Sequence, residues 1–252
     1  MLHFASNLDP RIQLAFTTQS EGNLALHVND DPDTVGENRA RLEDRIGVRR
    51  FSLQFMNQVH SNILHDAELV ERSQWNEPPA PTCDALIDAS GEVPLAVMVA
   101  DCLPVLFVGT GGPSGPTVTA AVHAGRRGLL DGILARTVVR LHELGASQIE
   151  AVIGPAICGR CYEVPVQMAE ESESLRPGIR TTTSWGTDSL DLPASAQQEL
   201  ENLGVQVLQS GACTLEDERF FSYRRSEKSG RLAGLIWRDI NADATRRTEK
   251  AE

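Results

Sequence analysis

Short apolar runs, separated by glycine, proline and polar residues, recur along the whole chain and indicate β-strands. The strands predicted from them are residues 14–18, 23–28, 51–55, 83–87, 95–100, 105–108, 118–122, 149–153, 205–208 and 232–237. Their spread from one end of the chain to the other predicts a core built on β-sheet.

Helical patterns lie between these runs. The first predicted helix follows Asp31, a favourable N-cap, has Pro32 at its first position and ends before Gly47. A later segment repeats its apolar residues close to every 3.6 positions and predicts one long helix, which Gly145 ends. The predicted helices are residues 32–46, 127–144, 165–175 and 193–203.

The elements predict one compact α+β domain with a mixed β-sheet core flanked by helices, since there is no internal repeat and no low-complexity linker. This domain is expected to span residues 1–241. The tail at residues 242–252 is expected to be disordered. Residues 75–81 contain three prolines and predict an irregular, exposed loop.

The composition narrows the class of protein. The 252-residue chain has a net charge of -12, which argues against nonspecific binding to nucleic acids or anionic membranes. No apolar run is long enough to cross a bilayer, and the N-terminus has no secretory signal pattern, so a cytoplasmic location is expected. Five cysteines are an odd number, and their thiols are expected to be reduced.

Candidate chemistry gathers at the ends of predicted strands. Asp101 and Cys102 lie between two apolar runs, a third run leads into His123, and His60 lies in the polar segment NQVHSN. Two imidazoles and one thiolate are a ligand set that zinc accepts, with a fourth position left for water or substrate. The three residues are far apart in the sequence, and spacing by itself favours a packing role for the cysteine.

A second interpretation makes Cys102 a nucleophile, with His123 as its general base and Asp101 orienting the imidazole. The order of residues in the sequence does not separate a nucleophile from a metal ligand. Bound metal at one equivalent would separate them.

Two basic segments stand out in this acidic chain. Arg126 and Arg127 follow Gly125 at the start of the strongest predicted helix, where helix N–H groups and guanidinium groups together suit a phosphate or carboxylate. Arg224, Arg225 and Arg231 form the second segment. A solvated, purely structural role explains each segment equally well in isolation.

Cys158 and Cys161 form a CxxC motif. A thioredoxin-type function would place the motif at a helix start after a first strand, and a structural zinc would need two more partners. Apart from the distant Cys213, the sequence offers neither, so packing is the expected role.

Six motifs in order resemble the YfiH family, also called the polyphenol oxidase or multicopper laccase-domain family, which includes a peptidoglycan editing factor. They are NQVHSN, CDALID, VMVADCLPVLF, AVHAGRRGLL, IGPAICGRCYEV and FFSYRRSEKSGRLAGLIW. The resemblance covers about residues 14–237. It implies a YfiH-like α+β domain whose metal ligands are His60, Cys102 and His123.

The resemblance also implies purine nucleoside chemistry on small molecules. The enzyme is expected to be a monomer. The implied reactions are phosphorolysis of adenosine, inosine, guanosine and methylthioadenosine, and hydrolytic deamination of adenosine. For proton transfer, Asp84 is the first candidate and Asp101 the second. The residues expected to bind substrate or phosphate are Asn57, Arg126, Arg127 and Arg224.

The chain departs from the family pattern in two places. Where the family has an early Arg before a glycine pair, this chain has Gln19 in a shortened segment, so a ligand contact by that arginine is not expected. Residues 157–161 carry the CxxC motif in place of a polar spacer, which is expected to alter a pocket wall.

The choice of metal and reaction has alternatives. A multicopper oxidase needs on the order of ten His ligands, whereas the chain has six His, so a copper-dependent polyphenol oxidase is disfavoured. Zinc is the expected metal, although copper also binds such ligands strongly. The alternatives to purine chemistry are a cysteine hydrolase or editing factor acting on a peptidoglycan precursor, and a noncatalytic metal-binding partner protein.

Overall fold

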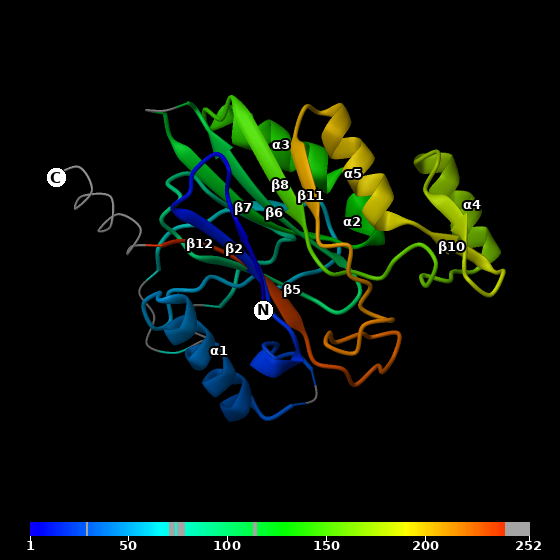
Figure 1. The fold of residues 1–252 in the computed structure, drawn as a ribbon, viewed down its shortest axis with the longest axis horizontal. Helices are drawn as coiled ribbons and strands as arrows, with labels where there is room; N and C mark the ends of the chain where they lie inside the picture. Colours follow the sequence, from blue (N-terminus) through cyan, green and yellow to red (C-terminus); the bar gives the residue numbers. More distant parts are fainter. Residues whose placement is uncertain (29, 71–73, 75–78, 113–114, 240–252) are drawn as a thin grey trace, which may run out of the picture.

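The described residues form two β-sheets that lie face to face, with helices on the outer face of each sheet (Figure 1). The computed structural model describes residues 1–28, 30–70, 74, 79–112 and 115–239. The tail predicted at residues 242–252, and residues 75–78 of the predicted proline-rich loop, lie outside the described residues.

The smaller sheet is antiparallel, with strand order β1-β2-β12-β5. Its strands are β1 (Leu2–Ala5), β2 (Ile12–Phe16), β12 (Leu232–Arg238) and β5 (Leu95–Val99). The larger sheet has the order β11-β8-β6-β7-β4-β3 and is mixed, because β11 and β3 join it in parallel. Its strands are β11 (Gln206–Gln209), β8 (Gln148–Ile153), β6 (Leu103–Thr110), β7 (Thr117–Ala124), β4 (Ala85–Asp88) and β3 (Leu64–Asp66).

Helices complete the outer layers. The larger sheet is covered by α2 (Arg126–Leu130), α3 (Ile133–Glu143) and α5 (Leu192–Asn202), and the smaller sheet by α1 (Pro32–Ile46). The helix α4 (Val166–Leu175) packs beside a hairpin of β9 (Arg180–Thr182) and β10 (Asp188–Leu190). A short 3₁₀ helix, η1 (Gln19–Glu21), follows β2.

The strand β6 shows why this architecture suits continuous apolar runs. Val105 and Phe107 pack into the core between the larger sheet and its helices, whereas Leu106 and Val108 pack into the core between the two sheets. Successive side chains point to opposite faces of a strand, so a strand covered on both faces must be apolar at every position. The predicted fold class, α+β with a mixed sheet flanked by helices, is confirmed.

The long helix predicted at residues 127–144 is interrupted. Gly132 adopts a left-handed φ of 78° between α2 and α3, and the Asp131 N–H bonds back to the carbonyl of Arg127. Glycine tolerates this conformation without a steric penalty. The apolar periodicity continues across the break, which is why the sequence pattern does not reveal it.

Two predicted strands are wrong because side chains take over their backbone hydrogen bonds. At residues 23–28, the Asn23 amide bonds both the N–H and the carbonyl of Ala25. At residues 51–55, the buried carboxylate of Glu43 accepts two backbone N–H groups, and a single bridge to β5 remains. Local side-chain bonds of this kind compete with strand pairing.

Short edge elements were not predicted. The strands β1 and β3 lie at sheet edges. The β9-β10 hairpin forms from the Thr/Ser-rich residues 180–190, in which apolar residues show no clear periodicity. The other predicted strands and helices are confirmed within a few residues at each end.

The connection from β5 to β6 is the point where the chain passes from the smaller sheet to the larger one. Asp101 and Cys102 form this crossover. Asp101 has a φ of 91°, unusual for a residue with a side chain, and such strained positions often accompany function.

Candidate metal centre

The structure brings His60, Cys102 and His123 together. Their candidate ligand atoms all lie within 4.8 Å of one another. Nε2 of His60 is 3.7 Å from Sγ of Cys102, and the two imidazole rings meet edge to face with centroids 4.7 Å apart. The donor set and its convergence suit a metal ion with three protein ligands and an open position.

Each ligand comes from a different element. His123 lies on β7, opposite Pro104 of β6, and is only 3% exposed. Cys102 belongs to the crossover between the sheets. His60 lies on an exposed loop, and its backbone also has a positive φ, 59°. Two strained residues at one place, His60 and Asp101, are consistent with a site that the surrounding fold holds in position.

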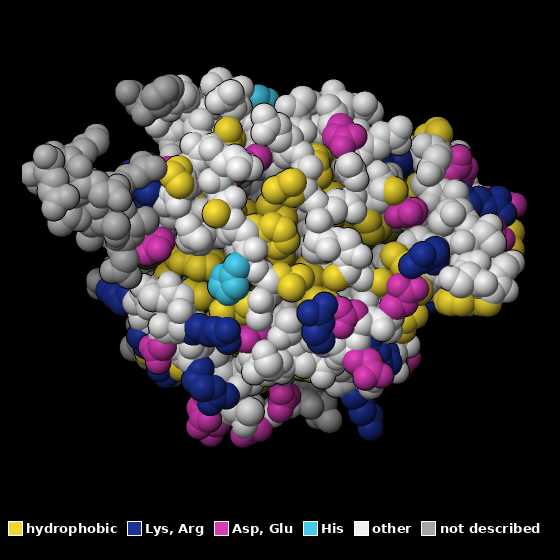
Figure 2. Space-filling model, viewed as in Figure 1, with side chains coloured by type: hydrophobic (Ala, Val, Ile, Leu, Met, Phe, Trp, Pro, Cys, Tyr) yellow, Lys and Arg dark blue, Asp and Glu magenta, His cyan; other side chains and the backbone are white. Residues whose placement is uncertain are grey.

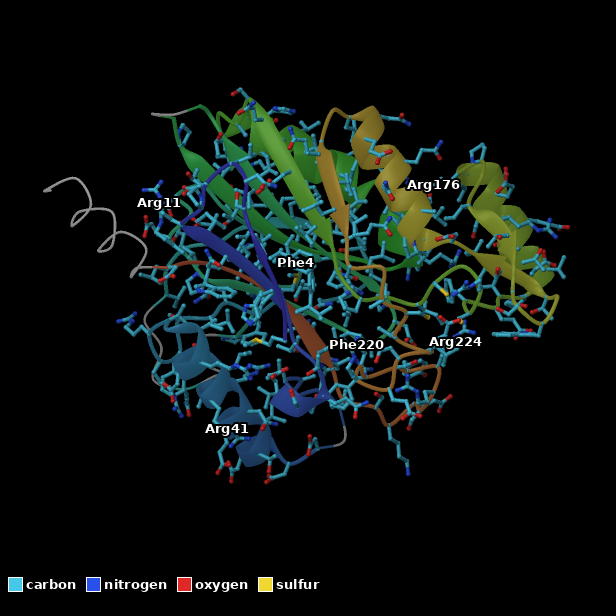
Figure 3. All side chains as sticks on the ribbon, viewed as in Figure 1. Phe4, Arg11, Arg41, Arg176, Phe220 and Arg224 are labelled. Atoms are coloured by element: carbon cyan, nitrogen blue, oxygen red, sulfur yellow. The ribbon has the colours of Figure 1, made fainter. Side chains whose placement is uncertain are left out.

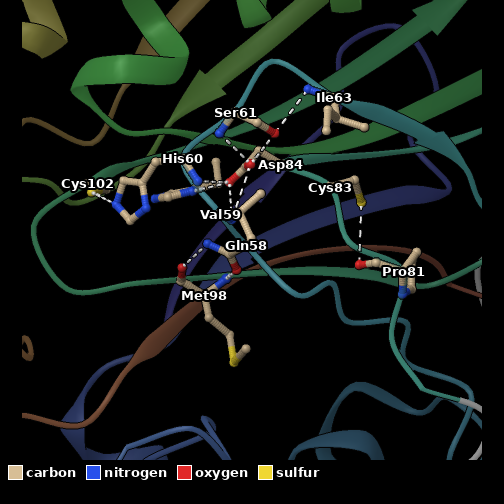
Figure 4. A network of polar contacts seen from close by, with 11 residues as sticks. Gln58, Val59, His60, Ser61, Ile63, Pro81, Cys83, Asp84, Met98 and Cys102 are labelled. Carbon is tan, nitrogen blue, oxygen red and sulfur yellow. Dashed lines mark hydrogen bonds and ion pairs between the residues drawn. The ribbon is translucent and has the colours of Figure 1, made fainter.

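Asp84 contacts both histidines, His123 through its side chain and His60 through its backbone N–H (Figure 4). Its carboxylate lies 2.8 Å from Nδ1 of His123 and accepts the backbone N–H groups of His60, Val59 and Ser61, and the Ser61 hydroxyl. Because Nδ1 of His123 is engaged, Nε2 is left as its ligand atom. A carboxylate behind a metal-binding histidine is the common arrangement that fixes tautomer and ring orientation.

Gly125 provides the space that the three ligands need. A Cβ at this position would lie 2.7 Å from Cδ2 of His60 and 3.3 Å from Sγ of Cys102. Its backbone is extended, with a φ of -68°, so the need for glycine here is steric rather than conformational.

The ionisation of the site is strongly coupled. Burial opposes ionisation of Cys102, but the charges and hydrogen bonds of His123 and His60 outweigh it and lower the pKa of the thiol to about 6. Burial would likewise lower the pKa of His123, yet the Cys102 thiolate and Asp84 raise it to about 9. For Asp84, burial would raise the pKa, but hydrogen bonds from His123 and Ser61 hold it well below its usual range.

A cavity of about 380 Å³ opens onto these ligands. Its wall contains His60, Cys102 and His123. The other lining residues are His27, Asn57, Gln58, Met98, Val99, Ala100, Tyr223 and Arg231. This volume is within the range that encloses a small organic ligand, and its wall combines apolar, aromatic and polar groups.

Asp101 does not line this cavity. Its carboxylate accepts the Thr214 hydroxyl at 2.6 Å and the backbone N–H of Arg224 at 2.8 Å, and its carbonyl accepts the N–H of Ile157. Asp84 does not line it either. Both carboxylates predicted to transfer protons are therefore engaged in holding neighbouring groups.

The predicted basic residues separate in space. Arg126 is half-buried and Arg127 is exposed at the start of α2. Arg224 lies on the loop between β11 and β12 (Figure 3), with its guanidinium 5.0 Å from the ring centre of Tyr162. Burial raises the pKa of the Tyr162 phenol, as does the charge of Cys102, while the charges of Arg224 and Arg126 act to lower it.

Arg225 is a structural residue. Its guanidinium donates to the backbone carbonyls of Phe220, Thr214, Leu215 and Asp217. These bonds pin the loop that carries Arg224, which leaves Arg225 poorly placed to hold a ligand.

Seven of the eleven lining residues are not among the predicted site residues, and Tyr223, Arg231 and His27 are the ones with an aromatic, cationic or imidazole side chain. Arg231 belongs to the second basic segment, and Tyr223 precedes Arg224 in the same motif, so an aromatic residue beside the arginines is a signal that the sequence offers. His27 lies in a segment predicted to be a strand, and nothing in its sequence context marks it. Asn57, which was predicted, does line the cavity.

Acidic and basic side chains are interspersed on the face shown in Figure 2. None of the described helices combines the length and the apolar character that a bilayer crossing requires.

Comparison with known proteins agrees with this fold. A family model described as multi-copper polyphenol oxidoreductase laccase matches residues 15–239. A Corynebacterium glutamicum protein named purine nucleoside phosphorylase is 41% identical over 246 residues, covering 92% of this chain and 97% of that protein.

Two crystal structures share the fold. A Neisseria meningitidis protein is 32% identical, with a TM-score of 0.78 over 94% of this chain and 98% of that one. The Bacillus licheniformis hypothetical protein YfiH is 26% identical, with a TM-score of 0.77 over 90% of this chain and 92% of that one. The chain therefore belongs to the multi-copper polyphenol oxidoreductase laccase family, and its predicted resemblance to YfiH is confirmed.

Proposed function

We propose that this protein is a zinc-dependent purine nucleoside phosphorylase acting on adenosine, inosine, guanosine and methylthioadenosine. The observation that carries the proposal is the cavity whose wall contains His60, Cys102 and His123, in a chain 41% identical to a protein named purine nucleoside phosphorylase. The proposal includes a monomeric enzyme in the cytoplasm.

The three side chains suit zinc as its ligands. Their ligand atoms converge, Asp84 orients His123, and Gly125 leaves the room that the cluster occupies. A zinc ion held there would supply Lewis-acid polarisation of a bound substrate group. Copper also binds imidazole and thiolate strongly, so the metal must be identified by measurement.

Around this centre, the chain's own residues bind the nucleoside. The exposed ring of Tyr223 offers a stacking surface for a purine, and the Asn57 amide and Arg231 guanidinium offer hydrogen bonds. The cavity of about 380 Å³ is large enough to exclude bulk water from part of a bound nucleoside, which strengthens polar contacts within it.

Arg126 and Arg224 are the proposed phosphate ligands. In phosphorolysis a phosphate oxygen bonds to C1′ of the ribose while the bond to the purine nitrogen breaks, and the departing base takes up a proton. Two guanidinium groups whose charges act on the Tyr162 phenol would hold and orient the phosphate dianion beside the nucleoside. Arg127 is exposed and is not proposed as a phosphate ligand.

Asp84 is proposed as a positioning residue rather than as a proton donor or acceptor for the substrate. Its oxygens are engaged by His123 and by the loop that carries His60, and it lies outside the cavity wall. Asp101 is likewise not proposed to transfer protons, because its carboxylate accepts hydrogen bonds from the Thr214 hydroxyl and the Arg224 backbone N–H.

Adenosine deamination at the same centre is a second candidate. The metal-binding side chains open on a nucleoside-sized cavity, as deamination requires. No carboxylate lines the described cavity wall, however, so proton transfer would fall to another group such as His27. This makes deamination the weaker activity in the proposal.

A cysteine hydrolase remains as an alternative from another class. The lowered pKa of Cys102 beside the raised pKa of His123 describes a thiolate–imidazolium pair, with Asp84 behind the imidazole. Such an enzyme would act on an amide or a peptidoglycan precursor, and it would need no metal.

The deciding experiment combines elemental analysis with nucleoside turnover. The purified protein is assayed with and without phosphate, after chelation and after reloading with zinc or copper. We expect phosphate-dependent release of purine base and ribose 1-phosphate that chelation abolishes and zinc restores. Full turnover by metal-free protein would refute the proposal, and loss of activity by alkylation but not by chelation would favour the hydrolase.

A further inference from the structure

A second cluster of metal-ligating side chains lies beside the first. Sγ of Cys158, Cys161 and Cys213 and a carboxylate oxygen of Glu216 all lie within 4.8 Å of one another. Cys161 and Cys213 are buried, Cys158 is half-buried and Glu216 is exposed. The sequence alone suggested a packing role for the CxxC motif, because two of its partners are far away in the chain.

The fold brings these residues together by joining two loops. Ala156 and Cys213 form a parallel bridge, and the Thr214 N–H donates to the carbonyl of Ala156 at 3.0 Å. The N–H of Cys158 then points at Sγ of Cys213, 3.4 Å away. An N–H donated to sulfur is a contact that stabilises a metal-bound thiolate.

We propose that Cys158, Cys161, Cys213 and Glu216 bind a structural zinc ion. The ligands come in two pairs with the same spacing, CxxC at Cys158 and Cys161 and CxxE at Cys213 and Glu216. Paired ligands at this spacing on two loops are typical of structural zinc sites, in which four protein ligands close the tetrahedron.

The convergence of the four ligand atoms is compatible with this coordination. Zinc–sulfur bonds of about 2.3 Å place the ligand atoms of a tetrahedral site about 3.8 Å apart. The four ligand atoms of this cluster lie within 4.8 Å of one another, so zinc binding would require each pair to approach by at most about 1 Å. The Glu216 carboxylate already contacts Sγ of Cys161 at 3.4 Å. Arg160, which pairs with Glu216 at 3.3 Å, offsets part of the negative charge of three thiolates and a carboxylate.

A redox role fits these residues less well. A thioredoxin-type pair has its first cysteine at a helix start, whereas Cys158 and Cys161 lie in a turn and the next helix, α4, begins at Val166. A disulfide would also use only two of the three cysteines. The third thiol and the Glu216 carboxylate beside it would then have no role.

The proposed zinc would stabilise the wall of the first site through Asp101. Asp101 accepts the N–H of Ile157, next to Cys158, and the hydroxyl of Thr214, next to Cys213. Asp101 immediately precedes Cys102. Joining the two loops through a metal would therefore hold the strained crossover on which the first centre depends.

The experiment measures the zinc content of the full-length protein and of single variants after expression with zinc. We expect about two equivalents in the native protein and about one in both Cys213→Ser and His60→Ala. Cys83→Ser, at a buried cysteine outside both clusters, should retain two. The readout is metal content rather than turnover, so failure of the nucleoside proposal leaves this result unaffected.

Glu216→Ala covers the case in which Cys213→Ser fails to fold, because Glu216 is exposed. In a His60→Ala background it should weaken zinc retention against a chelator about tenfold or more. Cobalt loaded into His60→Ala protein should show intense thiolate-to-metal charge transfer. Equal zinc content in Cys213→Ser and native protein, or a native mass lighter by the two hydrogens of a disulfide, would overturn the proposal.

Discussion

Oδ1 of Asp84 lies 2.8 Å from Nδ1 of His123, and the same oxygen accepts the backbone N–H of His60 at 3.0 Å. One fully buried carboxylate therefore supports two of the three candidate metal ligands, through a side chain on β7 and through the backbone of a loop. This relationship joins the stability of the fold to the geometry of the centre.

Replacing this carboxylate should damage metal binding. In Asp84→Asn, the amide cannot accept all of the hydrogen bonds, and one of its N–H groups must face a donor. We expect zinc affinity to fall about 10–100-fold and the free energy of unfolding to fall by about 1–3 kcal/mol. Chelator competition and denaturant unfolding measure the two effects.

Asp88→Asn is the matched control. Asp88 is buried at the end of β4, the strand that Asp84 immediately precedes, and it accepts the backbone N–H groups of Ser90 and Val93. Among the described residues, it has no hydrogen bond to His60 or His123. It should lose stability and keep zinc affinity. Equal loss of zinc affinity in both variants would show that Asp84 acts only through general stability.

Gly125→Ala should remove the metal with little backbone strain. The added methyl group would lie 2.7 Å from His60 and 3.3 Å from Cys102, and it must displace at least one of them. We expect zinc content to fall below about half an equivalent because misplaced ligands no longer complete the site. Elemental analysis of the folded protein measures this.

Gly109→Ala serves for comparison. A Cβ there would meet Ala146 at 2.8 Å in the core, far from the metal ligands along β6. Overpacking should destabilise this variant by about 1–3 kcal/mol without changing zinc content. If Gly125→Ala kept full zinc, the steric role assigned to Gly125 would be wrong.

Alkylation of metal-free protein should report the ionisation of Cys102. Its pKa is lowered to about 6, so the thiolate predominates above that pH and the reaction rate should fall as the pH drops below it. Burial raises the pKa of Cys83 to about 12, so that thiol should stay unreactive near neutral pH.

Peptide mass spectrometry after a timed iodoacetamide pulse identifies the modified residue at each pH. Reloading with zinc before the pulse should protect Cys102. A midpoint near the ordinary thiol value of about 8.5 would contradict the influence assigned to the two histidines.

Arg126→Gln should raise the KM for phosphate. Losing a charge-assisted hydrogen bond of about 1.5–3 kcal/mol corresponds to roughly a 10–150-fold effect on phosphate binding. The KM for the nucleoside should change much less. Steady-state kinetics at varied phosphate measures the split.

Arg127→Gln is the control for the loss of one positive charge at the start of α2, because Arg127 is exposed there. Its KM for phosphate should stay within about threefold of native, as expected for a screened surface charge. A larger effect at Arg127 than at Arg126 would reverse the assignment.

Much of the fold could be predicted from the sequence, because most segments adopt the secondary structure that their apolar periodicity and capping residues favour. The first helix has its predicted limits because Asp31 caps it and Gly47 takes a left-handed conformation at its end. Where prediction and structure differ, one residue accounts for the difference. Gly132 interrupts the predicted helix at residues 127–144, and the Glu43 carboxylate accepts backbone N–H groups of the predicted strand at residues 51–55. These competing contacts arise from conformations that apolar periodicity does not encode.

The sequence by itself determined which chemical groups the protein can use: two histidines and a cysteine, a CxxC motif, and arginines in an acidic chain. Only the tertiary structure decided how they combine. The crossover between sheets placed Cys102 beside His60 and His123, and the joining of two loops brought Cys213 and Glu216 to the CxxC motif. Metal binding depends on distances of a few ångströms between side chains, and those distances are set by sheet order and loop packing rather than by separation along the chain.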